Sequence, residues 1–142
     1  MIGILVISHG GLGDCLIGAA SHVLGKPSMA NVRALAVLPD ADRAALEADA
    51  KSLVKVLDDG SGVIVFTDIY GATPSNLAAT VLQPGRVEGF AGVNLPLLLR
   101  ALTCRELPLK SLSPKLRQVA AESVVHITAD CCNDHSKTYK AG

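Results

Sequence analysis

The 142-residue sequence has no tryptophan and only four phenylalanine and tyrosine residues, so aromatic side chains cannot supply most of a core. Hydrophobic residues still make up 49% of the chain. The core must therefore come mainly from Val, Leu, Ile and Ala, a composition typical of buried parallel strands covered by helices. A chain of this length forms one ordinary domain and is too short for two independent ones.

The sequence also lacks an excess of charge of either sign, because the formal charges of its 13 basic and 13 acidic residues cancel. Domains that bind nucleic acid or anionic membranes usually carry a basic surface, so we expect neither partner. No apolar run approaches the roughly 20 residues that a membrane helix needs. The N-terminus has neither the basic segment nor the cleavage site of a signal peptide. These absences predict a cytoplasmic protein without membrane insertion.

Cysteine is present four times, and in a cytoplasmic protein we expect these residues to be thiols. Cys131 and Cys132 lie near Asp130, His135 and, further back, His126. Adjacent cysteines do not match the usual zinc spacing, which separates the two ligands of a pair by two to four residues. We therefore predict a simple C-terminal tail over 129–142, no metal site and no cofactor.

Apolar runs alternate with helical patterns along the chain, separated by short turns. The expected strands are residues 3–8, 32–38, 63–66 and 87–93. The expected helices are residues 14–24, capped by Asp14, then 41–57, 75–82 and 95–103, and a last one to about 121 that starts at Ser113-Pro114. This alternation predicts one doubly wound α/β domain over 1–128, with a mainly parallel sheet and helices on both faces.

Residues 124–128 are apolar and β-branched enough for a further strand, but they follow the last helix. Such a strand could close the sheet edge of its own subunit or, antiparallel, that of a partner in a dimer. The pattern alone does not choose between these two arrangements.

Two loops at the predicted carboxyl ends of strands carry unusual polar content: residues 8–14 after the first strand and 67–76 after the third. Ligands of open α/β sheets bind at such ends, where the strand order reverses. If the order is 2-1-3-4, the first and third strands are neighbours and their loops meet. His9 and Asp68 would then face each other.

A neutral imidazole attacks phosphorus through its unprotonated nitrogen, so the proton must be held on the other one. A carboxylate that accepts this N–H fixes the tautomer and stabilises the developing positive charge. Asp68 is our candidate for that role beside His9, and Thr73 is the best-placed hydroxyl for a phosphoryl group. Further hydrogen bonds to phosphate are expected from Gly10, Gly71, Ser75 and Asn76.

Each of these features also has a purely structural interpretation. A single histidine beside a strand is often structural, Asp68 could cap a turn, and the glycines could form a tight turn. Gly11 and Gly13 imitate a dinucleotide-binding fingerprint, but Leu16 stands where the third glycine belongs. The functional interpretation is favoured because both polar loops fall at the same end of the sheet.

The segments "VISHGGLGDCLIGAA", "GVIVFTDIYGATPSNLA" and "GFAGVNLPLLLRAL" resemble the mannose-type enzyme IIA components of the bacterial sugar phosphotransferase system (PTS). The likeness runs from residue 1 to about 125. It implies a phosphohistidine carrier in which His9 is phosphorylated on the ring nitrogen turned away from Asp68. It also implies that Asp68 hydrogen-bonds the ring and that Thr73 helps to hold the phosphoryl group.

The resemblance further implies the phosphocarrier protein HPr as donor, a IIB protein or domain as acceptor, and a homodimer that exchanges a C-terminal strand. Because no linker or IIB domain follows, we expect a stand-alone IIA. Two alternatives remain open: a regulatory module switched by phosphorylation of His9, and a small tetrapyrrole metal chelatase, since those enzymes also present "SHG" after a first strand.

Overall fold

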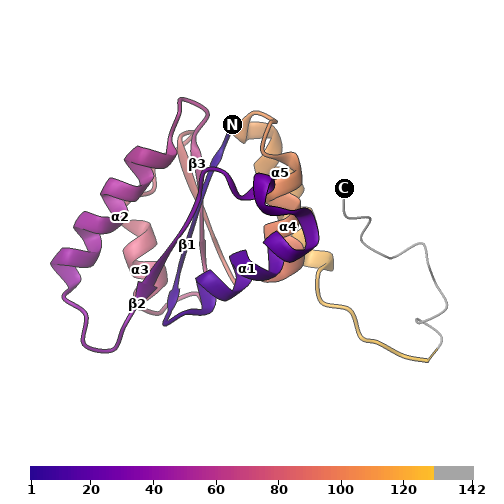
Figure 1. The fold of residues 1–142 in the computed structure, drawn as a ribbon, viewed down its shortest axis with the longest axis horizontal. Helices are drawn as coiled ribbons and strands as arrows, with labels where there is room; N and C mark the ends of the chain where they lie inside the picture. Colours follow the sequence, from indigo (N-terminus) through magenta and orange to yellow (C-terminus); the bar gives the residue numbers. More distant parts are fainter. Residues whose placement is uncertain (130–142) are drawn as a thin grey trace.

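The computed structural model describes residues 1–129, which fold around a four-stranded, all-parallel sheet with the order β2-β1-β3-β4 (Figure 1). This order confirms the predicted doubly wound topology. The strands are β1 (Gly3–His9), β2 (Val32–Val37), β3 (Val63–Thr67) and β4 (Val87–Ala91). Each agrees with its predicted strand to within about two residues at either end.

Helices cover both faces of the sheet, with α2 and α3 on one face and α1, α4 and α5 on the other (Figure 1). The helices are α1 (Leu12–Leu24), the short 3₁₀ helix η1 (Lys26–Met29), α2 (Arg43–Leu57), α3 (Thr73–Ala79), α4 (Leu95–Cys104) and α5 (Leu109–Glu122). Every connection between a strand and the next parallel strand contains a helix, as parallel pairing requires.

The side chains of β1 alternate between two aliphatic cores, because successive residues of a strand point to opposite faces. Ile4 and Val6 pack with α1, α4 and α5, whereas Leu5 and Ile7 pack with α2 and α3. These residues are completely buried. The two cores fix the strand in its register, so the residue at its carboxyl end has a defined position.

The starts of α1, α2 and α3 each differ from the prediction by two residues, and α2 begins at Arg43 rather than at residue 41. Gly11, not Asp14, is the N-cap of α1, and Asp14 lies in the first turn. The sequence predicts a loop at glycines 10, 11 and 13, but Gly13 already belongs to the helix. A Cβ at position 13 would lie only 3.2–3.3 Å from Val6, Ser8 and Ala34, so glycine allows α1 to approach β1 and β2 closely. Helix α3 begins at Thr73 rather than Ser75, because Pro74 is compatible with the first turn.

The last helix differs most. We predicted that it starts at Ser113-Pro114, but α5 begins at Leu109 and contains Pro114 in its interior. Leu109, Leu112 and Leu116 recur at helical spacing and are buried against the sheet. The burial of these leucines stabilises the helix by more than the hydrogen bond missing at Pro114 destabilises it.

No strand forms at residues 124–128 within the described part of the chain. Val124 and Ile127 are 88% and 75% exposed there, so the segment does not close the edge of its own sheet. Its exchange between the subunits of a dimer remains a prediction. The predicted tail residues Asp130, Cys131, Cys132 and His135 lie outside the described residues.

Candidate functional site

The pairing of β1 with β3 brings the two predicted loops together. Ile7 lies opposite Thr67 in the parallel ladder, so the chain leaves both strands at the same level and at the same end of the sheet. His9 and Asp68, which are 59 positions apart in the sequence, are consequently neighbours in space. The sequence prediction that these two residues meet is confirmed.

Asp68 contacts both the backbone and the ring of His9. Its Oδ2 lies 2.8 Å from Nδ1 of the imidazole and accepts the backbone N–H of His9 at 2.9 Å. Its Oδ1 accepts the backbone N–H of Ile69 at 2.9 Å. Both carboxylate oxygens are thus engaged, and the side chain is held in one orientation.

These contacts keep Asp68 ionised. Burial by itself raises the pKa of this carboxyl, but hydrogen bonds from the His9 backbone, the His9 ring and the Ile69 N–H together lower the pKa below its ordinary value of 3.8. An ionised carboxylate can only accept hydrogen bonds. Nδ1 of His9 therefore carries a proton, and in the neutral ring Nε2 has the free lone pair.

The His9 side chain is 54% exposed, whereas that of Asp68 is only 11% exposed. Within the described residues Nε2 makes no hydrogen bond. The arrangement thus combines a fixed ring, a defined tautomer and an accessible nucleophilic nitrogen. This geometry suits the transfer of a group to and from Nε2.

The loop after β1 is held by neighbouring strands. Gly10 has a positive φ of 52°, which favours glycine, and its N–H donates to the carbonyl of Val37 at the end of β2. Ser8, only 1% exposed, accepts the N–H of Gly13 through its Oγ at 2.9 Å. This role of Ser8 was not predicted from the sequence, although a hydroxyl at the end of a fully apolar strand was a usable signal.

The second loop carries the other predicted residues. The N–H of Gly71 donates to Oγ of Ser75 at 2.8 Å, and that hydroxyl donates to the carbonyl of Ala72. Ser75 and Gly71 therefore stabilise the loop. Thr73, the first residue of α3, and Asn76 are exposed, and neither makes a side-chain hydrogen bond within the described residues.

Exposed apolar side chains lie on the loops and at the start of α1 at this end of the sheet. Leu12 is 44% exposed, Leu38 54%, Ile69 57% and Tyr70 86%. They follow β1, β2 and β3, so they come from the same end of the sheet as His9. Large apolar side chains that remain accessible near a reactive group are a common feature of protein docking surfaces. We call these four residues the apolar rim.

No group of three or more His, Cys, Asp or Glu side chains is arranged to hold a metal ion among residues 1–129. Over the same residues, no helix has the length and apolar character needed to cross a membrane. His22 lies on α1 and is exposed.

Residues 3–119 match the family EIIA-man, described as "PTS system fructose IIA component". The fructose-specific EIIA component of Bacillus subtilis is 28% identical over 142 residues, covering 99% of this chain and 92% of that protein. The mannose-specific EIIAB component of Escherichia coli is 29% identical over 106 residues, covering 74% of this chain. This chain matches only 32% of the length of that longer protein.

Solved structures agree on the fold. A PTS component EIIA from Streptococcus agalactiae superposes with a TM-score of 0.78 at 21% identity, covering 89% of this chain and 97% of that one. A PTS IIA protein associated with the fucose utilization operon of Streptococcus pneumoniae has a TM-score of 0.69 at 27% identity. That alignment covers 87% of this chain and 91% of the other.

Proposed function

Because this chain belongs to the EIIA-man family of PTS IIA components, which act in phosphoryl transfer, we propose that it carries a phosphoryl group on Nε2 of His9. The observation that supports this most directly is the hydrogen bond of 2.8 Å between Nδ1 and Asp68, with the rest of the ring open to a partner. Asp68 is then the orienting residue.

In the proposed step, the lone pair of Nε2 attacks phosphorus and forms a P–N bond, while the bond between phosphorus and the donor breaks and the donor keeps its electron pair. The proton on Nδ1 stays in place, so the ring acquires positive charge. Asp68 offsets this charge at short range. The reverse of this step passes the phosphoryl group to the next carrier.

The phosphoryl oxygens need hydrogen-bond donors, and the two loops differ in what they offer. Thr73 and Asn76 have exposed side chains available for such bonds. The N–H groups of Gly10 and Gly71 already donate within the protein, as does the hydroxyl of Ser75. We therefore assign phosphate contacts to Thr73 and Asn76, and assign the shaping of the two loops to Gly10, Gly71 and Ser75.

The proposed partners are HPr as donor and a PTS IIB component as acceptor, both meeting the protein at the apolar rim in the cytoplasm. A partner must bring its own phosphorylated group to within bonding distance of Nε2. Exposed Tyr70 and Ile69, on the loop that carries Asp68, are suited to exclude water from such an encounter. We also propose that the protein acts as a homodimer.

The test is phosphorylation of the purified protein by phosphoenolpyruvate, enzyme I and HPr. We expect one phosphoryl group per chain, labile in acid and stable in base, in the wild type and in the control variant His22→Ala. The His9→Ala variant should accept none. An unlabelled wild-type protein, or a fully labelled His9→Ala variant, would contradict the proposal.

The same labelled protein separates transport from regulation. Phosphorylated and unmodified forms are each used to capture partners from a cell extract. Capture of a IIB protein favours transport, whereas capture of a kinase or a transcription factor favours the regulatory alternative, because phosphate adds about −1.5 to −2 charge to the surface at neutral pH.

A further inference from the structure

A concave site lies at the opposite end of the sheet from His9. It is a pocket of about 480 Å³ between the C-terminal ends of α2 and α3, and it extends to the start of β4. Its lining residues are Lys51, Val54, Lys55, Asp58, Thr80, Val81, Gln83, Arg86 and Val87. The volume falls within the range of small-molecule sites in proteins, which is about 300–1,000 Å³.

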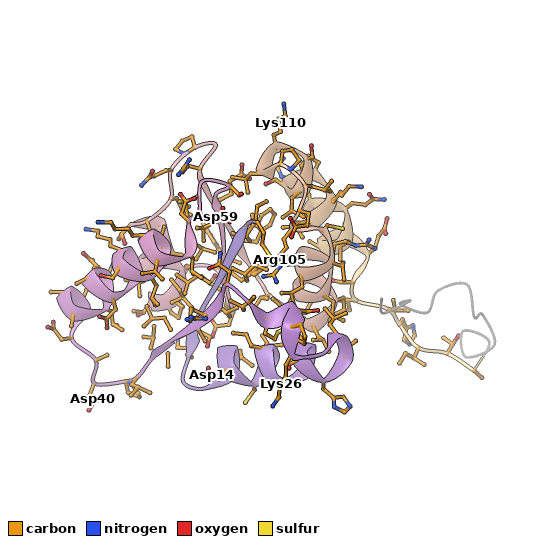
Figure 2. All side chains as sticks on the ribbon, turned by 45° about the horizontal axis from the view of Figure 1, so that its top comes forward. Asp14, Lys26, Asp40, Asp59, Arg105 and Lys110 are labelled. Carbon is orange, nitrogen blue, oxygen red and sulfur yellow. The ribbon has the colours of Figure 1, made fainter. Side chains whose placement is uncertain are left out.

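The two sites are well separated. His9 ends β1, whereas this pocket adjoins the amino ends of β3 and β4, and a strand of seven residues spans about 20 Å. In Figure 2, Asp59, which adjoins Asp58 in the sequence, lies well above Asp14 in the first turn of α1. A ligand in this pocket would not touch the proposed phosphorylation site.

The charge of the lining is predominantly positive. Three cations, Lys51, Lys55 and Arg86, face a single carboxylate, Asp58. That carboxylate is already occupied: its Oδ2 accepts a hydrogen bond from Nε of Arg86 at 2.6 Å, and its Oδ1 accepts the N–H groups of Gly60 and Gly62. The remaining charge on the pocket wall therefore comes from the two lysines.

Neither lysine has a carboxylate partner among residues 1–129. Glu47 stands one helical turn before Lys51, where it could form a pair, but it binds Arg43 at 3.1 Å. Lys51 and Lys55 are themselves one turn apart, a spacing at which like charges repel. The negative end of the helix dipole favours Lys55 in the last turn of α2, but this effect does not extend to Lys51.

The remaining wall limits the chemistry of the ligand. Val54, Val81 and Val87 form the apolar part of the lining, and Gln83 adds an amide. The hydroxyl of Thr80 donates to the carbonyl of Leu77 at 2.7 Å, so towards a ligand it can act as an acceptor. Aromatic side chains are absent from this lining, so it offers no stacking partner for a nucleobase. Two unpaired cations beside neutral hydrogen-bonding groups match a dianionic phosphate attached to a body that carries hydroxyls.

We propose that this pocket, which we call the distal pocket, binds a phosphate monoester of a small polyol, of the size of a sugar phosphate. Lys51 and Lys55 bind the phosphate through charge-assisted hydrogen bonds. Gln83 donates to or accepts from the hydroxyl groups of the ligand, and Oγ1 of Thr80 accepts from them. The proposal does not depend on His9, so the two sites can be tested separately.

The test is a calorimetric titration of the full chain with glucose 6-phosphate and fructose 1-phosphate at low ionic strength. We expect saturable binding with a dissociation constant in the millimolar range or tighter. The double variant Lys51→Gln/Lys55→Gln should weaken binding at least about tenfold, because both charged contacts are lost. Both lysines are exposed, so this variant keeps its fold, which circular dichroism verifies.

A matched control removes the same amount of charge elsewhere. Lys26→Gln/Lys110→Gln changes two exposed lysines of η1 and α5, labelled in Figure 2, neither of which lines the distal pocket. This control and His9→Ala should both bind like the wild type. The proposal is overturned if the sugar phosphates do not bind, if the control loses as much affinity as the lysine variant, or if inorganic phosphate or glucose alone binds equally well.

Discussion

At the scale of single residues, Asp68 shows how one carboxylate sets the state of a neighbouring ring. Its Oδ2 accepts both the backbone N–H and the ring N–H of His9, so the position and the tautomer of the imidazole are fixed by the same atom. An amide of the same shape could not do this, because its NH₂ group can donate to Nδ1 and move the ring proton to Nε2.

Asp68→Asn should therefore slow phosphorylation of His9 by HPr by about 100-fold or more, because the wrong tautomer blocks Nε2 and the compensating negative charge is lost. The initial rate of label incorporation measures this effect. Asp14→Asn removes an exposed acid from the first turn of α1 and should leave the rate nearly unchanged. Equal rates for Asp68→Asn and the wild type would show that the carboxylate does not orient the ring.

The sequence was sufficient to predict the pairing of His9 with Asp68, because strand order alone decides which loops meet. It was not sufficient to separate residues that face a ligand from residues that hold the loop. Ser75 illustrates this limit, since its hydroxyl is engaged with Gly71 and Ala72 through contacts that depend on the local backbone conformation.

At the scale of elements, α5 shows that packing can override a local signal. Ser-Pro is a common helix start, yet the chain is already helical for five residues before Pro114. The hydroxyl of Ser113, which was expected to cap the helix, instead donates to Glu88 of β4. The helical spacing of Leu109, Leu112 and Leu116 was the better signal for this start than Ser-Pro.

Pro114→Ala should stabilise the protein, because the alanine N–H can donate to the carbonyl of Lys110 one turn earlier. We expect the free energy of unfolding to rise by about 1–2 kcal/mol, part of the usual proline cost being offset by the greater freedom of the unfolded chain. Urea unfolding followed by circular dichroism measures the change.

The control for this prediction is Lys115→Ala, at an exposed position on the same helix. Its effect should stay within about 0.5 kcal/mol, which is typical of surface substitutions. A loss of stability in Pro114→Ala would mean that the proline ring makes contacts worth more than the missing hydrogen bond.

At the scale of the whole molecule, three aspartates make the free energy of unfolding depend on pH in the acidic range. Burial raises the pKa of Asp58 and of Asp68, but hydrogen bonds to each carboxylate outweigh this and leave both pKa values below 3.8. The N-terminal ammonium and Ser61 lower the pKa of Asp59 to about 2. The native state therefore binds fewer protons than the unfolded state in this range.

Stability should be constant above about pH 5 with respect to these groups, and fall as the pH decreases from about 4 towards 2. Urea midpoints measured across this range test the sign. Asp58→Asn should start from a lower stability at neutral pH and lose less of it in acid than the wild type does. A midpoint that rises on acidification would contradict this assignment.

The topology of the whole molecule was predictable because each buried strand is a short aliphatic run and each connection carries a helical pattern. The fate of residues 124–128 was not, because their apolar pattern is the same whether a sheet edge covers them or not. Val124, Val125 and Ile127 remain exposed after α5. Only the position of a possible partner edge decides between these outcomes, and sequence pattern contains no information about it.

The anchoring of the loop after β1 has a consequence for recognition. Val37 of one neighbouring strand, Asp68 beyond the other and Ser8 of β1 itself all hold its backbone in place. If His9 carries a phosphoryl group as proposed, we therefore expect the loaded and empty forms to share the backbone of this loop. A partner that distinguishes them must respond to the added negative charge and to the phosphoryl oxygens themselves, and it meets a surface that needs no rearrangement before the encounter.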